Sequence, residues 1–247
     1  MILRPWGEKV PDVLISPWTI LGKEARIIKL FNPILSSAQV MSISGGEASV
    51  AENMLADLVQ LAREGKDPVK IVINSPGGSV QAGFTILLFM EHLKACGIEI
   101  WTINIGNANS MAGIILAMGT RGRRYALDNT TTHVHEVQIS GLGGKGTDID
   151  KMKEHIDHQR DVIERLLAEH TKIPEFAAKE LELGIDEKRV KEDPKARKKL
   201  VREFSGSENL LTASKALEAG MIDEILKPGN QTLNDIFLIP SHKEEKQ

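Results

Sequence analysis

Two short turns carry serine and glycine in a pattern suited to acyl transfer. Residues 74–79 read Asn-Ser-Pro-Gly-Gly-Ser, and residues 107–113 read Asn-Ala-Asn-Ser-Met-Ala-Gly. Each turn follows an apolar, β-rich run and leads into an apolar helical pattern. Two adjacent strand-turn-helix units of this kind can bring a serine hydroxyl beside backbone N–H groups. A nucleophile and an oxyanion hole are the parts that acyl transfer requires.

Ser110 stands where the second strand-like run becomes a helix. The first turn of a helix offers free amides and the positive end of the helix dipole, so the Met111 amide is expected to point at an oxyanion formed beside Ser110. Gly78 can supply a second amide, because glycine lets the backbone approach a substrate closely. The same residues also fit simpler roles, a helix-capping serine at 110 and an ordinary tight turn at 76–78.

A nucleophilic serine needs a base, and the β-branched run 130–137 holds His133 and His135 on one sheet face. A His-x-His pair can also bind a metal, but no cysteine or third histidine lies nearby at matching spacing. We therefore expect neither a metal nor a cofactor. The glycine-rich stretch 143–147 departs from a Walker A loop, since a glycine follows its lysine. Any ATP that the activity needs is expected to be hydrolysed by another protein.

The composition excludes several other classes. A hydrophobic fraction of 41% and a charged fraction of 26% are typical of a soluble globular protein. The net charge of −3 and the aromatic fraction of 4% argue against nucleic acid and anionic membranes as partners. The N-terminal residues lack the apolar core of a signal peptide, and we expect a cytoplasmic protein. Cys96 is the single cysteine, which excludes an intrachain disulfide, and its setting predicts a core thiol.

The first half of the chain alternates strand and helix patterns. Strands are expected at 26–31, 69–73, 98–105 and 125–127, and helices at 47–63, 80–95 and 110–118. This order favours α/β architecture with mainly parallel strands.

The second half is dominated by helical and charged segments. A long amphipathic helix is expected at 148–170, either as an arm that packs on a partner chain or as a buried spine of the same domain. Residues 180–203 carry charges of both signs and predict a solvated helix or surface insertion. A short capped helix at 212–220 and an extended segment at 221–226 follow. From Lys227 onward we expect a loosely held tail.

Four ordered blocks of this chain carry the motifs of one known family. They comprise residues 73–83 around the Pro-Gly-Gly turn, 109–113 around Ser110, 124–129 followed by His135, and 212–223. Over roughly residues 20–228 they resemble the proteolytic subunit of the Clp protease, ClpP. The resemblance implies a ClpP/crotonase-like α/β fold, a superhelix of repeated strand-strand-helix units with a projecting handle helix.

The resemblance also implies a site and an assembly. Ser110 becomes the nucleophile, His135 the general base, and the amides of Gly78 and Met111 the oxyanion hole. It implies a serine endopeptidase that cleaves unfolded polypeptides, in stacked heptameric rings that form a tetradecamer fed by an AAA+ unfoldase. The domain boundaries that follow are an irregular segment 1–24, a peptidase domain 25–228 with a handle at about 138–170 and a charged insertion at about 180–205, and a tail 229–247.

Three features depart from the family pattern. The position of the family's catalytic aspartate holds Glu208, with Asn209 or no acid as alternatives. About two dozen extra residues precede it. Lys70 and Val72 stand where the family has tyrosines in the cleft that holds the ATPase loops, which makes docking to a standard unfoldase doubtful. Two other functions stay open: a weakly active or inactive ring subunit, and a crotonase-type acyl-CoA enzyme. The Ser110–His135 pair argues against the latter.

Overall fold

A computed structural model of the chain describes residues 23–35, 50–137, 146–207 and 209–239. Its centre is a sheet with the strand order β1-β2-β3-β4-β7, whose neighbours pair in parallel. These strands are β1 Ile27–Leu30, β2 Val69–Ser75, β3 Ile100–Asn109, β4 Arg124–Leu127 and β7 Glu224–Leu226. Two short strands extend the carboxyl end of β3. They are β5 Thr131–His133, parallel to β3, and β6 Leu210–Thr212, antiparallel to β5.

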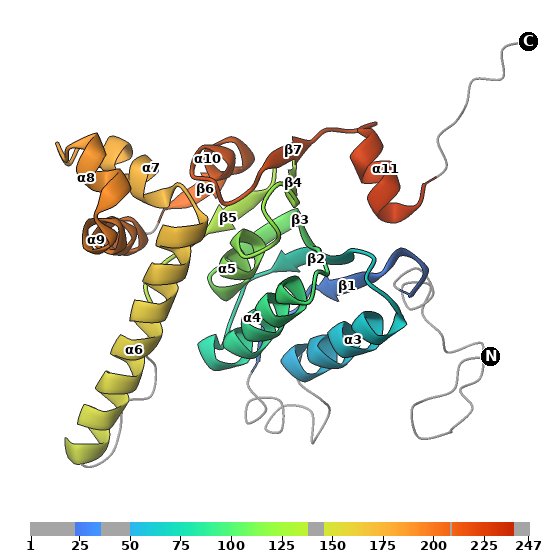
Figure 1. Cartoon of the computed structure of the whole chain (residues 1–247). Helices are drawn as coiled ribbons and strands as arrows, with labels where there is room; N and C mark the ends of the chain where they lie inside the picture. The colour runs from blue at the N-terminus through green and yellow to red at the C-terminus, as the bar shows by residue number, and fades with distance from the viewer. Residues whose placement is uncertain (1–22, 36–49, 138–145, 208, 240–247) are drawn as a thin grey trace, which may run out of the picture.

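Helices cover both faces of this sheet (Figure 1). They are α3 Val50–Glu64, α4 Val80–Ala95, α5 Met111–Ala117, α6 Gly146–His170, α7 Ile173–Glu180, α8 Glu187–Glu192, α9 Pro194–Gly206, α10 Ala213–Glu218 and α11 Gln231–Phe237. The parallel α/β fold expected of a ClpP/crotonase-like protein is confirmed. The predicted strands and helices of the first half occur, although β3 continues to Asn109.

The central strands are buried on both sides because each alternates between two apolar clusters. In β2, Ile71 and Ile73 belong to the main core beneath α3, α4 and α5, whereas Val72 belongs to a second cluster on the opposite face. All three side chains are fully buried. Continuous apolar strands of this kind are typical of parallel sheets covered by helices on both faces.

The described residues after Lys227, 228–239, do not form a loosely held tail, contrary to the prediction. They include α11, which begins at Gln231 and is capped by Asn230, whose side chain accepts a hydrogen bond from the Thr232 amide at 2.8 Å. Ile236 is fully buried in the second apolar cluster. Lys70 donates to the carbonyl of Ile236 at 3.3 Å, and burial lowers the pKa of this lysine. The second face of the sheet would otherwise expose its apolar side chains to water, and α11 covers it.

The long helix α6 projects at its start and is buried at its end, while packing of the projecting end on a partner chain stays a prediction. Residues 149–155 are all exposed, and this end projects from the body (Figure 1). The other end is packed in the core, where Leu167 is fully buried. Helix α6 is therefore an arm at its start and a structural spine at its end.

The charged segment after α7 has a buried face. Leu200, Val201 and Phe204 of α9 are buried in the main core. On the flank of α9, Arg202 donates to both carboxylate oxygens of Glu164 on α6, at 2.8 and 2.9 Å. Additional ion pairs join Lys198 to Asp161 of α6 and Arg197 to Glu175 of α7. The segment is thus an amphipathic insertion fastened to α6.

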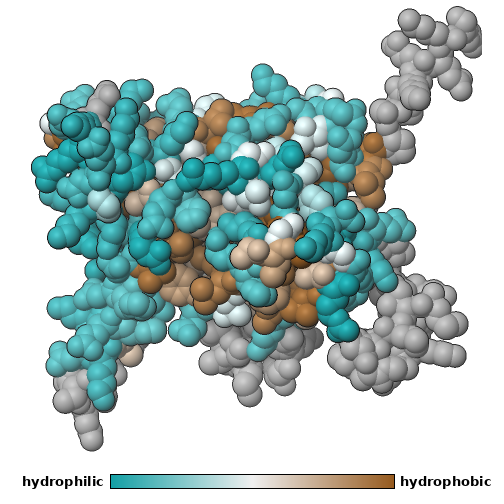
Figure 2. Space-filling view, viewed as in Figure 1, coloured by the Kyte–Doolittle hydropathy of each residue, from teal (hydrophilic) through white to brown (hydrophobic). Residues whose placement is uncertain are grey.

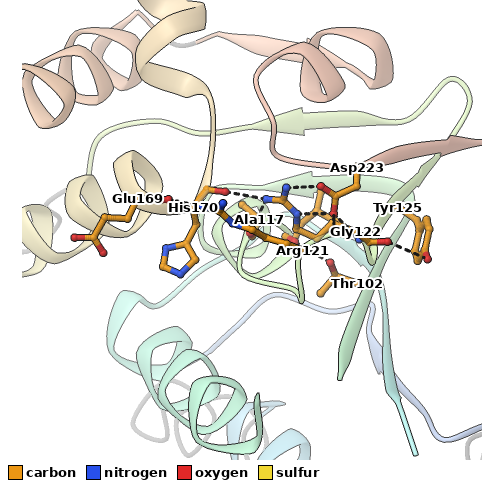
Figure 3. A network of polar contacts seen from close by, with 10 residues as sticks. Thr102, Ala117, Arg121, Gly122, Tyr125, Glu169, His170 and Asp223 are labelled. Carbon is orange, nitrogen blue, oxygen red and sulfur yellow. Dashed lines mark hydrogen bonds and ion pairs between the residues drawn. The ribbon is translucent and has the colours of Figure 1, made fainter. Parts of the chain in front are cut away.

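A buried arginine, Arg124, joins the sheet to α5 and α6, and its partners Ala117, His170 and Asp223 are labelled in Figure 3. Arg124 of β4 donates to both carboxylate oxygens of Asp223, at 2.8 and 2.5 Å, and to the carbonyls of Ala117 and His170, both at 3.1 Å. Burial acts to raise the pKa of Asp223, but the hydrogen bonds and charge of Arg124 outweigh it. The pKa of Asp223 therefore lies below its ordinary value.

Cys96 is exposed, contrary to the prediction of a core thiol. Helix α4 ends at Ala95, so Cys96 occupies the cap position, where the chain leaves the packed face. On the same helix Leu88 is 71% exposed. Apolar surface gathers over the middle of the molecular face that includes α4 (Figure 2).

Candidate active site

Ser110 occupies a strained turn between β3 and α5. Its φ and ψ are 53° and −126°, a combination that is costly for any residue other than glycine. Three hydrogen bonds hold the turn. The Ser110 amide donates to the His133 carbonyl at 2.6 Å, and the Ser110 carbonyl accepts from the amides of Gly113 and Ile114 at 3.0 and 3.3 Å. The Ser110 side chain makes no capping hydrogen bond. The strained backbone thus presents a hydroxyl that the helix does not use.

The Pro-Gly-Gly turn passes directly behind Ser110. A Cβ atom on Gly77 would lie 2.3 Å from the Asn109 carbonyl oxygen and 2.7 Å from the Ser110 Cβ. Since Gly77 also has a φ of +86°, no other residue fits this position without moving the Ser110 turn. Ser75 fixes the approach, because its fully buried hydroxyl accepts from the Gly77 amide at 3.1 Å and donates to the Asn32 carbonyl at 2.8 Å. The sequence analysis missed this role of Ser75.

Two amides near Ser110 are available to a substrate. Ile34 bridges to Gly78 in parallel fashion, with its amide donating to the Gly77 carbonyl at 2.7 Å and its carbonyl accepting from the Ser79 amide at 2.6 Å. In such a bridge, the N–H and C=O of Gly78 itself point to the opposite side. Met111 is the first residue of α5, where an amide has no partner within the helix. Within the described residues neither amide donates to another group.

A cavity of about 390 Å³ collects the residues expected to act on a substrate. Its described lining comprises Ile34, Leu35, Pro76, Gly78, Ser79, Val80, Ser110, Met111, Ile114, His135, Glu136, Val137 and Ile163. The expected nucleophile, base and oxyanion-hole residues therefore line the same cavity. Ile163 comes from α6, and no sequence signal connected it with the site.

The ring of His135 is oriented by a neighbouring carbonyl. Its Nδ1 lies 2.6 Å from the Glu136 carbonyl oxygen. A carbonyl only accepts, so Nδ1 carries the proton and Nε2 is left as the basic nitrogen. His133 has its ring centroid 5.2 Å from that of His135, but it does not belong to the described lining of the cavity. Where the chain is described, no group of three His, Cys, Asp or Glu residues is arranged to hold a metal.

The expected acid, Glu208, lies outside the described residues. Its neighbour Asn209 donates through Nδ2 to the Ser207 hydroxyl at 2.6 Å and to the Phe204 carbonyl at 3.4 Å. These bonds tie the Asn209 side chain to the end of α9. Asn209, the alternative acid position, is thus engaged in structure.

A comparison of the sequence with models of known protein families agrees with this arrangement of turns, histidine and sheet. The family model described as Clp protease matches residues 22–229, which is most of the chain. The chain belongs to the Clp protease family. Members of this family are peptidases, generally of the serine type, which generally form rings and work with unfoldases. In the part of the chain that is described, no helix has the length and apolar character needed to cross a membrane.

Proposed function

We propose that this chain is a serine endopeptidase in which Ser110 is the nucleophile and His135 the general base. The observation that carries the proposal is the strained Ser110 turn, whose unused hydroxyl shares a cavity with a histidine and two available amides. A strained strand-to-helix turn is a common way to expose a nucleophilic serine. The family match supports peptide hydrolysis as the reaction.

The proposed reaction uses each group in turn. His135 Nε2 takes the proton of the Ser110 hydroxyl as Oγ attacks the peptide carbonyl carbon. The carbonyl oxygen becomes an oxyanion that accepts from the amides of Gly78 and Met111. Collapse of the intermediate breaks the C–N bond, and His135 gives its proton to the leaving amine. Water activated by His135 then cleaves the acyl-Ser110 ester and regenerates the site.

Glu208 completes the proposed triad. The antiparallel register pairs Thr131 with Thr212 and His133 with Leu210. Continued for two more residues, this register would set position 208 opposite position 135. Such a carboxylate would accept a hydrogen bond from the Nδ1–H of His135 in place of the Glu136 carbonyl, and its negative charge would stabilise the imidazolium.

We further propose that the substrate is an extended, unfolded polypeptide. While the Gly78 N–H serves the oxyanion, the outward C=O of Gly78 offers an acceptor for the backbone N–H of an extended peptide. A ring of identical chains in the cytoplasm, stacked as a tetradecamer through the handle (about 138–170), would enclose these sites, and an AAA+ unfoldase would supply substrates. Lys70 and Val72 are engaged beneath α11, which supports a mode of unfoldase docking that differs from the family's tyrosine-lined cleft.

One observation favours a second possibility, a ring subunit of low activity. The Nδ1 proton of His135 is already held by the Glu136 carbonyl, which bears no full charge to stabilise an imidazolium. If Glu208 does not replace that acceptor, the hydrolysis rate should be low even though the serine remains reactive. The crotonase-type alternative is disfavoured because the cavity brings a serine and a histidine together beside two amides, with Ser79 and Glu136 as the other polar side chains of its described lining.

A labelling experiment tests the main proposal. Purified protein treated with a fluorophosphonate should gain one adduct, located on Ser110 by mass spectrometry, and Ser110→Ala should abolish it. Absence of an adduct, together with no cleavage of an unfolded protein, would overturn the proposal. Glu208→Gln should lower peptide hydrolysis by about 10²-fold or more, whereas Asn209→Ala should not. Equal effects of the two variants would contradict the assignment of Glu208.

A further inference from the structure

We propose that Glu136 is a specificity-determining residue that favours substrates with a lysine or arginine side chain close to the scissile bond. This inference rests on the proposed function of the cavity. Glu136 follows the expected base His135, is exposed, and lines the same cavity as Ser110. Apart from the titratable His135, it is the one ionisable side chain in the described lining. The other residues of the described lining are apolar or uncharged, so Glu136 supplies the negative charge of this part of the cavity.

The Glu136 carboxylate is not neutralised by direct contact with a described cation. No ion pair or side-chain hydrogen bond joins it to another described residue. The cation that acts on it through space is Arg202. The Nε–Nη2 edge of that guanidinium is committed to the buried carboxylate of Glu164, with hydrogen bonds of 2.8 and 2.9 Å, and among the described residues no hydrogen bond or ion pair joins Arg202 to Glu136. The oxygens of the Glu136 carboxylate can therefore accept hydrogen bonds from a cationic side chain of the substrate.

The neighbouring helix end adds to the negative potential. A Cβ atom on Gly206, the last residue of α9, would lie 3.9 Å from Glu136 Oε1. The carboxyl end of a helix carries unpaired carbonyls and partial negative charge. The carboxylate thus sits at the cavity rim beside a second source of negative potential. Lysine and arginine side chains can reach such a rim while their methylene groups rest on apolar surface. Aspartate and glutamate would be repelled there.

The experiment compares matched fluorogenic peptides that differ at one position within three residues of the cleaved bond. One of these positions should contact Glu136. At that position, the peptide with lysine should have a kcat/KM about tenfold higher than the peptide with glutamate, and the peptide with glutamine should lie between them. Glu136→Gln should reduce this ratio to near unity, and Glu136→Lys should invert it. Glu203→Gln removes a carboxylate of α9 that lines a different cavity, and it should leave the ratio unchanged.

Two further measurements make the outcome decisive. The wild-type ratio should fall severalfold between about 0.05 and 0.5 M NaCl, because salt screens a solvent-exposed charge pair. A ratio near unity at every position, or one that survives in Glu136→Gln, would overturn the assignment. Fluorophosphonate labelling of Ser110 in the same samples separates this failure from failure of the proposed function. A labelled enzyme without charge preference refutes only the role of Glu136, whereas an unlabelled enzyme refutes the peptidase itself.

Discussion

Replacement of Gly77 by alanine tests whether close backbone approach holds the Ser110 turn in its strained form. The added Cβ would stand 2.3 Å from the Asn109 carbonyl oxygen, 2.7 Å from the Ser110 Cβ and 2.9 Å from the Met111 nitrogen. An ordinary carbon–oxygen contact is about 3.2 Å or longer, so one of the two turns must move by nearly 1 Å. The atoms that must yield are backbone atoms on both sides of the nucleophile.

The cost has two parts that a control variant can separate. Alanine at the Gly77 φ of +86° costs about 1–2 kcal/mol in backbone strain, and the overpacking adds about 1–3 kcal/mol. Gly97 has a nearly identical φ of +81°, but nothing lies within 4 Å of its Cβ position. Gly97→Ala should therefore carry the strain without the clash. Urea denaturation should show a loss of about 1–2 kcal/mol for Gly97→Ala and a larger loss for Gly77→Ala.

Gly77→Ala and Gly97→Ala should differ more in activity than in stability. A misplacement of about 1 Å at a reacting centre can cost about 10²-fold in rate. We expect Gly77→Ala to slow fluorophosphonate labelling of Ser110 by about that factor, and Gly97→Ala to label at the wild-type rate. The rate should be measured where both variants remain folded by circular dichroism. A folded Gly77→Ala protein that labels at the wild-type rate would refute the reasoning.

Three other predictions concern the supporting structure. Arg202→Met should destabilise the fold by about 3–5 kcal/mol, because it leaves the carboxylate of Glu164 buried without its partner, and Glu164→Gln added to it should restore part of the loss in urea titrations. Asp223 has a lowered pKa in the folded state, so its stabilising effect is complete above its unfolded pKa of about 3.9 and is lost as the pH falls through the folded value. Asp223→Asn should cost about 2–4 kcal/mol at neutral pH by leaving Arg124 unpaired, and stability measured from pH 6 to 2 should depend less on pH than in the wild type. Ile236→Ala should cost about 2–4 kcal/mol if α11 is part of the folded core, and a change below about 0.5 kcal/mol would contradict that packing.

The regular elements of the first half could be predicted because their signals are local. The apolar runs before residues 74 and 107 have the composition of buried strands, and helical spacing follows each. Their boundaries could not be predicted, since β3 continues through Asn109 by pairing with β5 at residues 107–109 and with β2 at Ala108. Helix α11 was missed because three apolar residues in a short segment are a weak signal. It is stabilised by packing its apolar residues against the second apolar cluster of the sheet, which is a tertiary contact.

Within the candidate site, the types of the functional residues could be predicted, but the contacts that hold those residues in place could not. Ser110 and Gly78 belong to motifs whose spacing indicates a nucleophile and an amide donor. The orientation of His135 depends on a carbonyl one residue away, and the fixing of the Pro-Gly-Gly turn depends on the buried hydroxyl of Ser75. Neither contact leaves a pattern in the sequence, because any residue supplies a carbonyl and a serine in a turn has many roles.

The sequence by itself determined which groups can do chemistry and the order in which the elements follow one another. Composition and periodicity are properties of the chain, and they indicate an α/β protein with a serine, a histidine and two glycine-bearing turns. Only the tertiary structure decided that Gly77 packs against Ser110, that His135 shares its cavity, and that α9 is fastened to α6. These are contacts between residues far apart in the chain, and they exist only after the burial of apolar surface has fixed the relative positions of sheet and helices.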